Sequence, residues 1–109
     1  MNQEIMEITD KIKKTVDCER IYLFGSHAYG TPKIDSDYDF YVVIPDDTIR
    51  PIEAMQKIYS TLSKTNMLTP VDVLASYASQ FEERKSLPTL ESKVAKEGIM
   101  LYERNGLSM

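Results

Sequence analysis

The chain has 109 residues, of which 42% are hydrophobic and 28% are charged, and its net charge is −4. This length predicts one domain, spanning residues 1–109, around a single core. The composition argues against disorder. The acidic balance argues against DNA or RNA as the main partner, because nucleic-acid binding needs a cationic surface. The lone cysteine, Cys18, excludes an intramolecular disulfide and a thiolate metal cluster.

The N-terminal residues follow an acidic, periodic pattern and lack the basic, continuously apolar pattern of a signal peptide. No apolar run approaches the roughly 20 residues that a membrane-spanning helix needs. A single buried thiol is compatible with a reducing compartment. We therefore expect a cytoplasmic protein without a membrane segment.

The first half of the chain predicts one helix followed by two strands. Apolar residues recur at helical spacing over residues 2–17, which predicts an amphipathic helix. Residues 20–24 form a β-favouring run that ends at a glycine. Residues 25–36 contain two glycines, a proline and small polar residues, which predicts a loop with one helical turn. A second strand is expected over residues 37–44.

The second half predicts three helices and two strands. Pro51 suits the first position of a helix, which a Thr-Pro pair ends before a third strand over residues 71–75. Short helices are expected over 77–86 and 88–97, and a last strand over 99–102. The apolar stripe of the helix that begins at Pro51 is expected in the core and consists of Ile52, Met55, Ile58, Tyr59 and Leu62.

The predicted order of elements is therefore α-β-β-α-β-α-α-β. This order indicates an α+β fold with a small mixed β-sheet of three to four strands. We expect the helices to cover one face of the sheet and the chemistry to take place on the uncovered face.

Two polar features follow the first predicted strand. Gly25 allows the backbone to approach a ligand closely, and a helical turn that starts at Ser26 would direct its N–H groups and the serine hydroxyl at phosphate oxygens. Asp37 and Asp39 stand two positions apart at the start of the next strand, so their carboxylates project from the same face. Two parallel carboxylates repel each other unless a cation lies between them, and oxygen ligands suit Mg²⁺.

A third acidic residue, Asp72, lies between two valines in a predicted strand that we expect to be largely buried. A carboxylate there is costly without a partner. A third metal-ligating position would explain it, and it would place a base near an attacking hydroxyl.

These residues carry a resemblance to a known family. Gly25-Ser26, a gap of ten residues and Asp37-Tyr38-Asp39 resemble the signature G-S-x10-D-x-D of the polymerase-β-like nucleotidyltransferases. Asp72 matches the third carboxylate of that family. The short length and the ending Glu97–Tyr102 are similar to the minimal nucleotidyltransferase (MNT) branch. The resemblance implies a palm-like nucleotidyltransferase fold and enzymatic activity.

The resemblance also implies a mechanism and its cofactors. Asp37 and Asp39 would bridge two Mg²⁺ ions, and Asp72 would ligate the ion beside the acceptor hydroxyl, so the three aspartates are the expected catalytic and metal-binding residues. Gly25 and Ser26 would hold the β- and γ-phosphates of a nucleoside triphosphate, with ATP as the expected substrate.

Proteins of the MNT type resemble antitoxins that are encoded with HEPN-domain ribonuclease toxins. This resemblance implies transfer of AMP to a tyrosine hydroxyl of the partner toxin. Two alternatives stay open: an antitoxin that neutralises its toxin by binding alone, and a dimeric nucleotidyltransferase that acts on a small molecule. A homo-oligomer or a hetero-oligomer is compatible with each of them.

The sequence departs from the family at two positions near the expected phosphate site. Family members often carry arginine where this chain has His27 and Tyr29. A local packing role for His27 is as compatible with the sequence as a phosphate contact. Lys33, or Arg84 and Lys85, could supply the missing positive charge, although each also suits an ordinary surface position.

Overall fold

The computed structural model describes residues 3–30, 32, 36–65 and 69–104. The elements agree closely with the predicted order, and the expected helical turn is present as α2. In chain order they are α1 (Gln3–Thr15), β1 (Arg20–Phe24), α2 (Ser26–Tyr29), β2 (Tyr38–Ile44), α3 (Pro51–Ser63), β3 (Val71–Tyr77), α4 (Ala78–Arg84), α5 (Leu90–Glu97) and β4 (Ile99–Glu103).

The four strands form one mixed sheet in the order β3-β2-β1-β4. The strand β1 is antiparallel to both of its neighbours, β2 and β4, whereas β2 and β3 run parallel. The parallel pair is joined through α3, as such a connection requires. The predicted α+β class and mixed sheet are therefore confirmed.

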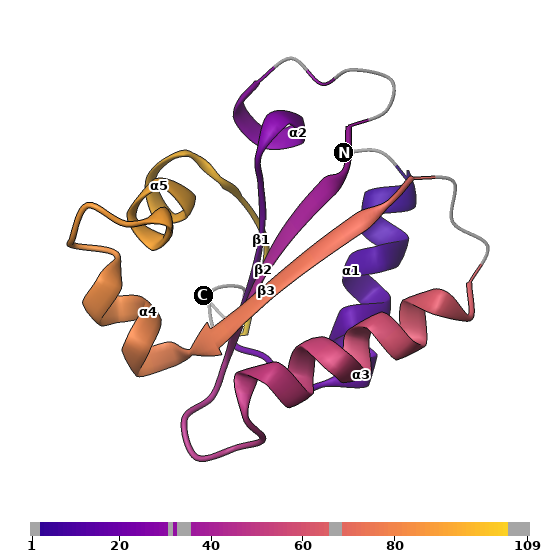
Figure 1. Cartoon of the computed structure of the whole chain (residues 1–109), viewed down its shortest axis with the longest axis horizontal. Coiled ribbons are helices and arrows are strands. Elements are labelled where there is room, and N and C mark those ends of the chain that lie inside the picture. The colour runs from indigo at the N-terminus through magenta and orange to yellow at the C-terminus, as the bar shows by residue number, and fades with distance from the viewer. Residues whose placement is uncertain (1–2, 31, 33–35, 66–68, 105–109) are drawn as a thin grey trace.

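The main core lies between one face of the sheet and the helices α1 and α3. Figure 1 shows these two helices side by side on that face. Their buried side chains, among them Ile8, Ile12 and Ile58, pack against Leu23 of β1 and Phe40 of β2. Each of these five side chains is less than 2% exposed, so this face supplies most of the apolar burial that drives folding.

Helices also cover part of the second face, so the prediction of helices on one face was wrong in this detail. Phe81 of α4 and Val94 of α5 pack there against Tyr22, Tyr41 and Val43, and Figure 1 shows α4 and α5 on the side opposite α1 and α3. The physical reason is the strand pleat, which sends successive side chains to opposite faces. An apolar run along β2 therefore needs cover on both faces.

Two apolar side chains expected in the core are exposed, Ile52 at 48% and Tyr59 at 42%, and Met6 of α1 is exposed at 54%. They lie at the margins of the buried stripes of α1 and α3. Tyr59 has a structural role there, because its hydroxyl accepts a hydrogen bond of 2.7 Å from the backbone N–H of Val73. Since β3 is an edge strand, this contact closes part of the edge against unwanted pairing.

Local sequence signals account for the ends of several elements. Pro51 begins α3, and Glu53 accepts a hydrogen bond from the backbone N–H of Arg50. Gly98 ends α5 in an extended conformation. A Cβ atom at Gly98 would lie 2.6 Å from the carbonyl oxygen of Val94 and 3.1 Å from that of Leu23. The glycine is therefore required by close packing of the helix end against β1.

Two further features concern the cysteine and the helices. Cys18 is buried, as expected, and burial raises the pKa of its thiol to about 11. Among the described residues, none of the helices has both the length and the apolar character to span a bilayer.

Candidate active site

The three predicted aspartates meet at the start of the parallel strand pair. In the β2–β3 register Asp39 lies directly opposite Asp72, so the two side chains project from the same face. Asp37 immediately precedes β2, and its carboxyl group interacts with that of Asp72 and raises the pKa of Asp72. The fold thus brings together residues that are more than 30 positions apart in the sequence.

Asp72 does not occupy the buried position that the sequence suggested. Its side chain is exposed, because β3 is an edge strand and only Val73 and Ser76 of that strand are buried. Asp39 is half-buried. The Asp72 carboxylate is therefore open to solvent, whereas the Asp39 carboxylate is partly covered by the fold.

Burial and mutual repulsion shift the acidity of this group. The pKa of Asp39 is raised, first by burial and then by the charges of Asp72 and Asp37, while the nearby His27 acts in the opposite direction. The pKa of Asp72 is also raised, by partial desolvation and by its hydrogen bond and charge interaction with Asp37. Burial is the larger cause of both shifts, and the charge contributions indicate that the three carboxylates lie close enough to repel one another.

Gly25 lies directly against this carboxylate group. Its φ angle is +76°, and a Cβ atom there would lie 2.2 Å from an oxygen of the Asp39 carboxylate. Both the left-handed conformation and the missing side chain are therefore required. The turn α2 follows at once, and the carbonyl of Gly25 accepts hydrogen bonds from the N–H groups of Ala28 and Tyr29. Ser26, the first residue of α2, is thus placed beside Asp39.

The two residues that replace arginine in this region have local partners. The ring of His27 packs edge-on against Tyr38 at 4.6 Å, and its Nε2 atom lies 3.2 Å from the carbonyl oxygen of Ser36. These contacts match the packing role that the sequence left open for this residue. The ring of Tyr29 lies beneath the ammonium group of Lys93, 4.8 Å from the ring centroid.

The cations that we considered as substitutes are engaged elsewhere or lie outside the described residues. Arg84 forms an ion pair of 3.0 Å with Glu91, and Lys85 forms one of 2.7 Å with Glu82. Lys33 is one of the residues that the structure does not describe. Arg84 therefore links α4 to α5, whereas Lys85 pairs locally at the end of α4.

A buried polar network on the same face was missed in the sequence. The Tyr41 hydroxyl donates a hydrogen bond of 2.7 Å to Glu91 and lies 2.9 Å from the Ser76 hydroxyl. Burial opposes ionisation of Glu91, but hydrogen bonds from Tyr41 and Arg84 outweigh it and lower the pKa. The only available signal was an acidic residue at position 91, three residues before the apolar Val94 on one helix face.

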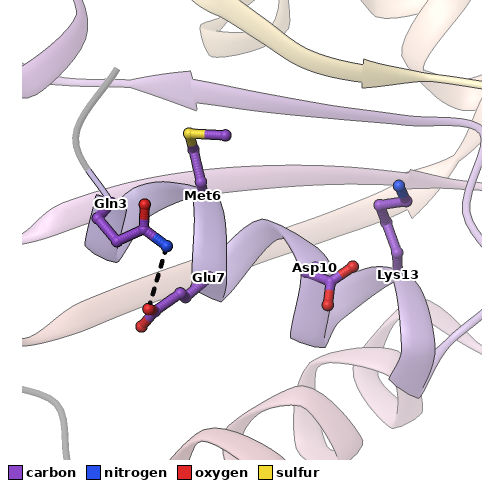
Figure 2. Close-up of a pocket in the computed structure, with 5 residues that line it drawn as sticks. All are labelled: Gln3, Met6, Glu7, Asp10 and Lys13. Carbon is purple, nitrogen blue, oxygen red and sulfur yellow. Dashed lines mark hydrogen bonds between the residues drawn. The ribbon is translucent and has the colours of Figure 1, made fainter.

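A hollow of about 410 Å³ lies elsewhere, on α1. Figure 2 shows that it follows one side of this helix, where Gln3 donates a hydrogen bond to Glu7. Its remaining lining residues are Met6, Asp10 and Lys13. Because α1 packs on the first face of the sheet, this hollow is separate from the aspartates on the second face.

The aspartate group fits a divalent cation in its chemistry. Within the described ranges, no three acidic, histidine or cysteine side chains already stand at metal-ligand spacing. However, Asp37 and Asp72 are close enough to interact, and both raise the pKa of Asp39 by their charge. Carboxylate oxygens are the ligands that Mg²⁺ prefers, and a bound cation would relieve the repulsion that these pKa values record.

Comparison with known proteins places this arrangement in context. Solved structures with the same fold include a protein from Sulfolobus solfataricus described as a candidate nucleotidyltransferase, with a TM-score of 0.65 and 18% identity, covering 95% of this chain and 81% of that one. A mutant of the toxin–antitoxin pair MntA–HpeT has a TM-score of 0.57 and 23% identity, with 94% and 74% coverage. A toxin–antitoxin structure with AMP-PNP has a TM-score of 0.54 with the same identity and coverage.

The comparison with curated protein sequences found no match. The family model described as polymerase beta, nucleotidyltransferase, matches residues 6–106. This span includes all five predicted site residues and every strand of the sheet. The chain therefore belongs to the polymerase beta nucleotidyltransferase family.

Proposed function

We propose that the protein transfers AMP from ATP to a hydroxyl group of a partner protein, with Mg²⁺ as cofactor. The observation that carries this proposal is the meeting of Gly25, Asp39 and Asp72 at one point of the second face. The backbone at Gly25 approaches the Asp39 carboxylate closely. A phosphate bound at Ser26 would therefore lie next to the aspartates that we propose as metal ligands.

Each residue has a role in the proposed transfer. Asp37, Asp39 and Asp72 would hold Mg²⁺, which supplies charge neutralisation and a lowered pKa for the attacking hydroxyl. Gly25 and Ser26 would orient the β- and γ-phosphates through the backbone and the hydroxyl group. The bond between the acceptor oxygen and the α-phosphorus forms as the bond to the bridging oxygen breaks, and pyrophosphate leaves. We assign acceptance of the hydroxyl proton to the exposed carboxylate of Asp72.

We further propose that the protein acts as the antitoxin of a HEPN/MNT pair in the cytoplasm. Two similar structures are toxin–antitoxin pairs, and one of them contains AMP-PNP, an ATP analogue. The mutant pair carries two Asp→Glu changes that are two positions apart, the same spacing as Asp37 and Asp39. These observations support a protein acceptor and an adenine nucleotide.

The test uses the full chain, Mg-ATP and the protein encoded by the adjacent gene. We expect the intact mass of that protein to increase by one AMP unit. The variants Asp37→Asn and Asp39→Asn should give no increase, whereas Asp10→Asn on α1 should give the normal increase. Labelling that survives Asp39→Asn would contradict the metal assignment, and absence of labelling with the wild-type protein would contradict the proposed transfer.

A second candidate is an antitoxin that acts by binding alone. The contacts of His27 favour this function, because its ring already packs against Tyr38 and its Nε2 atom lies beside the carbonyl oxygen of Ser36 instead of facing a phosphate site. Calorimetry with Mg-ATP distinguishes the two functions, since an antitoxin that acts only by contact does not need to bind the nucleotide. A dimeric enzyme for small molecules would instead modify an added acceptor without the partner protein.

A further inference from the structure

The turn α2, which forms the phosphate side of the proposed site, contains little positive charge. The four residues of α2 are Ser26, His27, Ala28 and Tyr29. None of them is lysine or arginine, and His27 is engaged with Ser36 and Tyr38. A bound triphosphate would add several negative charges next to three aspartates. Cationic side chains from another element would reduce the resulting repulsion.

The helix α5 brings one lysine to this turn. Its Glu91 and Val94 face the sheet and are buried, and Thr89 caps its start by accepting a hydrogen bond of 3.2 Å from the N–H of Ser92. Its end is packed against β1 through Gly98. With the helix fixed in this way, the exposed Lys93 extends to α2, where its ammonium lies 4.8 Å from the ring centroid of Tyr29.

Among the described residues of α4, α5 and β1, Lys93 and Lys96 have no carboxylate partner, unlike the other cations there, and of these two only Lys93 lies over an aromatic ring. Arg20 pairs with Glu82 at 2.7 Å, and Arg84 and Lys85 pair with carboxylates as well. Among the described residues, no carboxylate lies within 4.0 Å of the Lys93 ammonium. An aromatic ring attracts a cation without cancelling its charge. Lys93 is therefore oriented by Tyr29 and remains available for an anion.

We propose that Lys93 binds the β- or γ-phosphate of the nucleotide and that Tyr29 is a positioning residue for it. This inference rests on the proposed nucleotide-transfer function and identifies a further residue of the same site. The long, flexible stem of lysine permits its ammonium to leave the ring and follow a phosphate oxygen bound at Ser26. Lys93 of α5, positioned by Tyr29 of α2, would supply the positive charge that arginines within α2 would otherwise provide.

The test is calorimetric titration of the full chain with Mg-ATP and, separately, with AMP. The variant Lys93→Met keeps most of the apolar stem and removes the charge. We expect it to weaken Mg-ATP binding by about tenfold or more, the usual effect of losing a charge-assisted hydrogen bond. AMP binding should change by less than about twofold, because AMP lacks the β- and γ-phosphates.

Two further variants test the positioning role and the specificity of the charge. Tyr29→Phe keeps the ring and should bind Mg-ATP as the wild type does, whereas Tyr29→Leu should weaken Mg-ATP binding more than AMP binding. Lys57→Met removes the same charge from α3, on the first face of the sheet, and should leave both affinities unchanged. Circular dichroism of each variant reports whether the fold is retained.

The outcomes separate this inference from the function on which it rests. If the wild type binds Mg-ATP and Lys93→Met binds it equally well, the role of Lys93 is refuted and the proposed function stands. An equal loss in Lys93→Met and Lys57→Met would also refute it, because net charge alone would explain the effect. If the wild type binds no Mg-ATP, both the proposed function and the role of Lys93 are refuted.

Discussion

Replacement of Asp39 by asparagine should stabilise the metal-free protein while abolishing its activity. The change removes one charge from three that repel each other, and it preserves the shape of the side chain beside Gly25. Asp39 is half-buried, so solvent screens part of the repulsion. We expect a gain of about 0.5–1 kcal/mol in the free energy of unfolding at pH 7, which corresponds to an increase in Tm of roughly 2–8 °C.

The stability difference between the wild type and Asp39→Asn should depend on pH. Because the pKa of Asp39 is raised in the folded state, the folded wild type binds its proton more tightly than the unfolded chain does. The wild type therefore loses stability relative to the variant as the pH rises from the ordinary value of 3.8 through the raised pKa. Thermal unfolding in EDTA between pH 4 and pH 8 should show that the advantage of Asp39→Asn shrinks at the acidic end.

Addition of Mg²⁺ should make the wild type more stable than the Asp39→Asn variant. A cation at ten times its dissociation constant stabilises the wild type by about 1.4 kcal/mol, and the variant should gain much less. Asp10→Asn is the matched control, because the hydrogen bond to Lys14 lowers the pKa of Asp10 and its removal should not raise Tm. An Asp39→Asn variant with the same or a lower Tm in EDTA at pH 7 would refute the argument from repulsion.

Three further changes have expected effects on the free energy of unfolding, each measured by urea denaturation. Gly25→Ala should destabilise the protein by roughly 1–3 kcal/mol and remove activity, since its Cβ would meet the Asp39 carboxylate. Tyr41→Phe should cost about 1–3 kcal/mol because it leaves the buried Glu91 without its hydroxyl donor. Ile58→Ala should cost about 2–5 kcal/mol through the cavity it creates in the main core. A cost below about 0.5 kcal/mol in any of the three would contradict the packing described.

Much of the fold could be predicted because its signals are local. The spacing of isoleucines in α1, Pro51 at the start of α3 and the glycine after β1 each depend on residues within one or two turns. The shared face of Asp37 and Asp39 follows from the two-residue repeat of a strand. Asp72 stands out because a carboxylate between two valines of a strand is costly without a partner, and the family signature then matches it to a third carboxylate.

Contacts between distant segments could not be predicted in the same way. The alignment of Asp39 with Asp72 depends on the parallel register of β2 and β3. The exposure of Asp72 depends on β3 lying at the edge of the sheet, and the pairing of Tyr29 with Lys93 depends on how α5 packs. None of these is encoded by spacing, because each results from the burial of apolar residues elsewhere in the chain.

On the second face of the sheet, the strand β2 carries one residue that contributes to stability and one that contributes to the proposed chemistry. Asp39 and Tyr41 are neighbours on the same face of β2. The polar groups around Tyr41 are satisfied by Ser76 and Glu91, whereas the charges around Asp39 repel one another. If burial on this face alone determined stability, conservative changes at the two positions would have effects of the same sign. We expect opposite signs, because Tyr41→Phe breaks a satisfied network and Asp39→Asn relieves a repulsion that only a bound cation would otherwise remove.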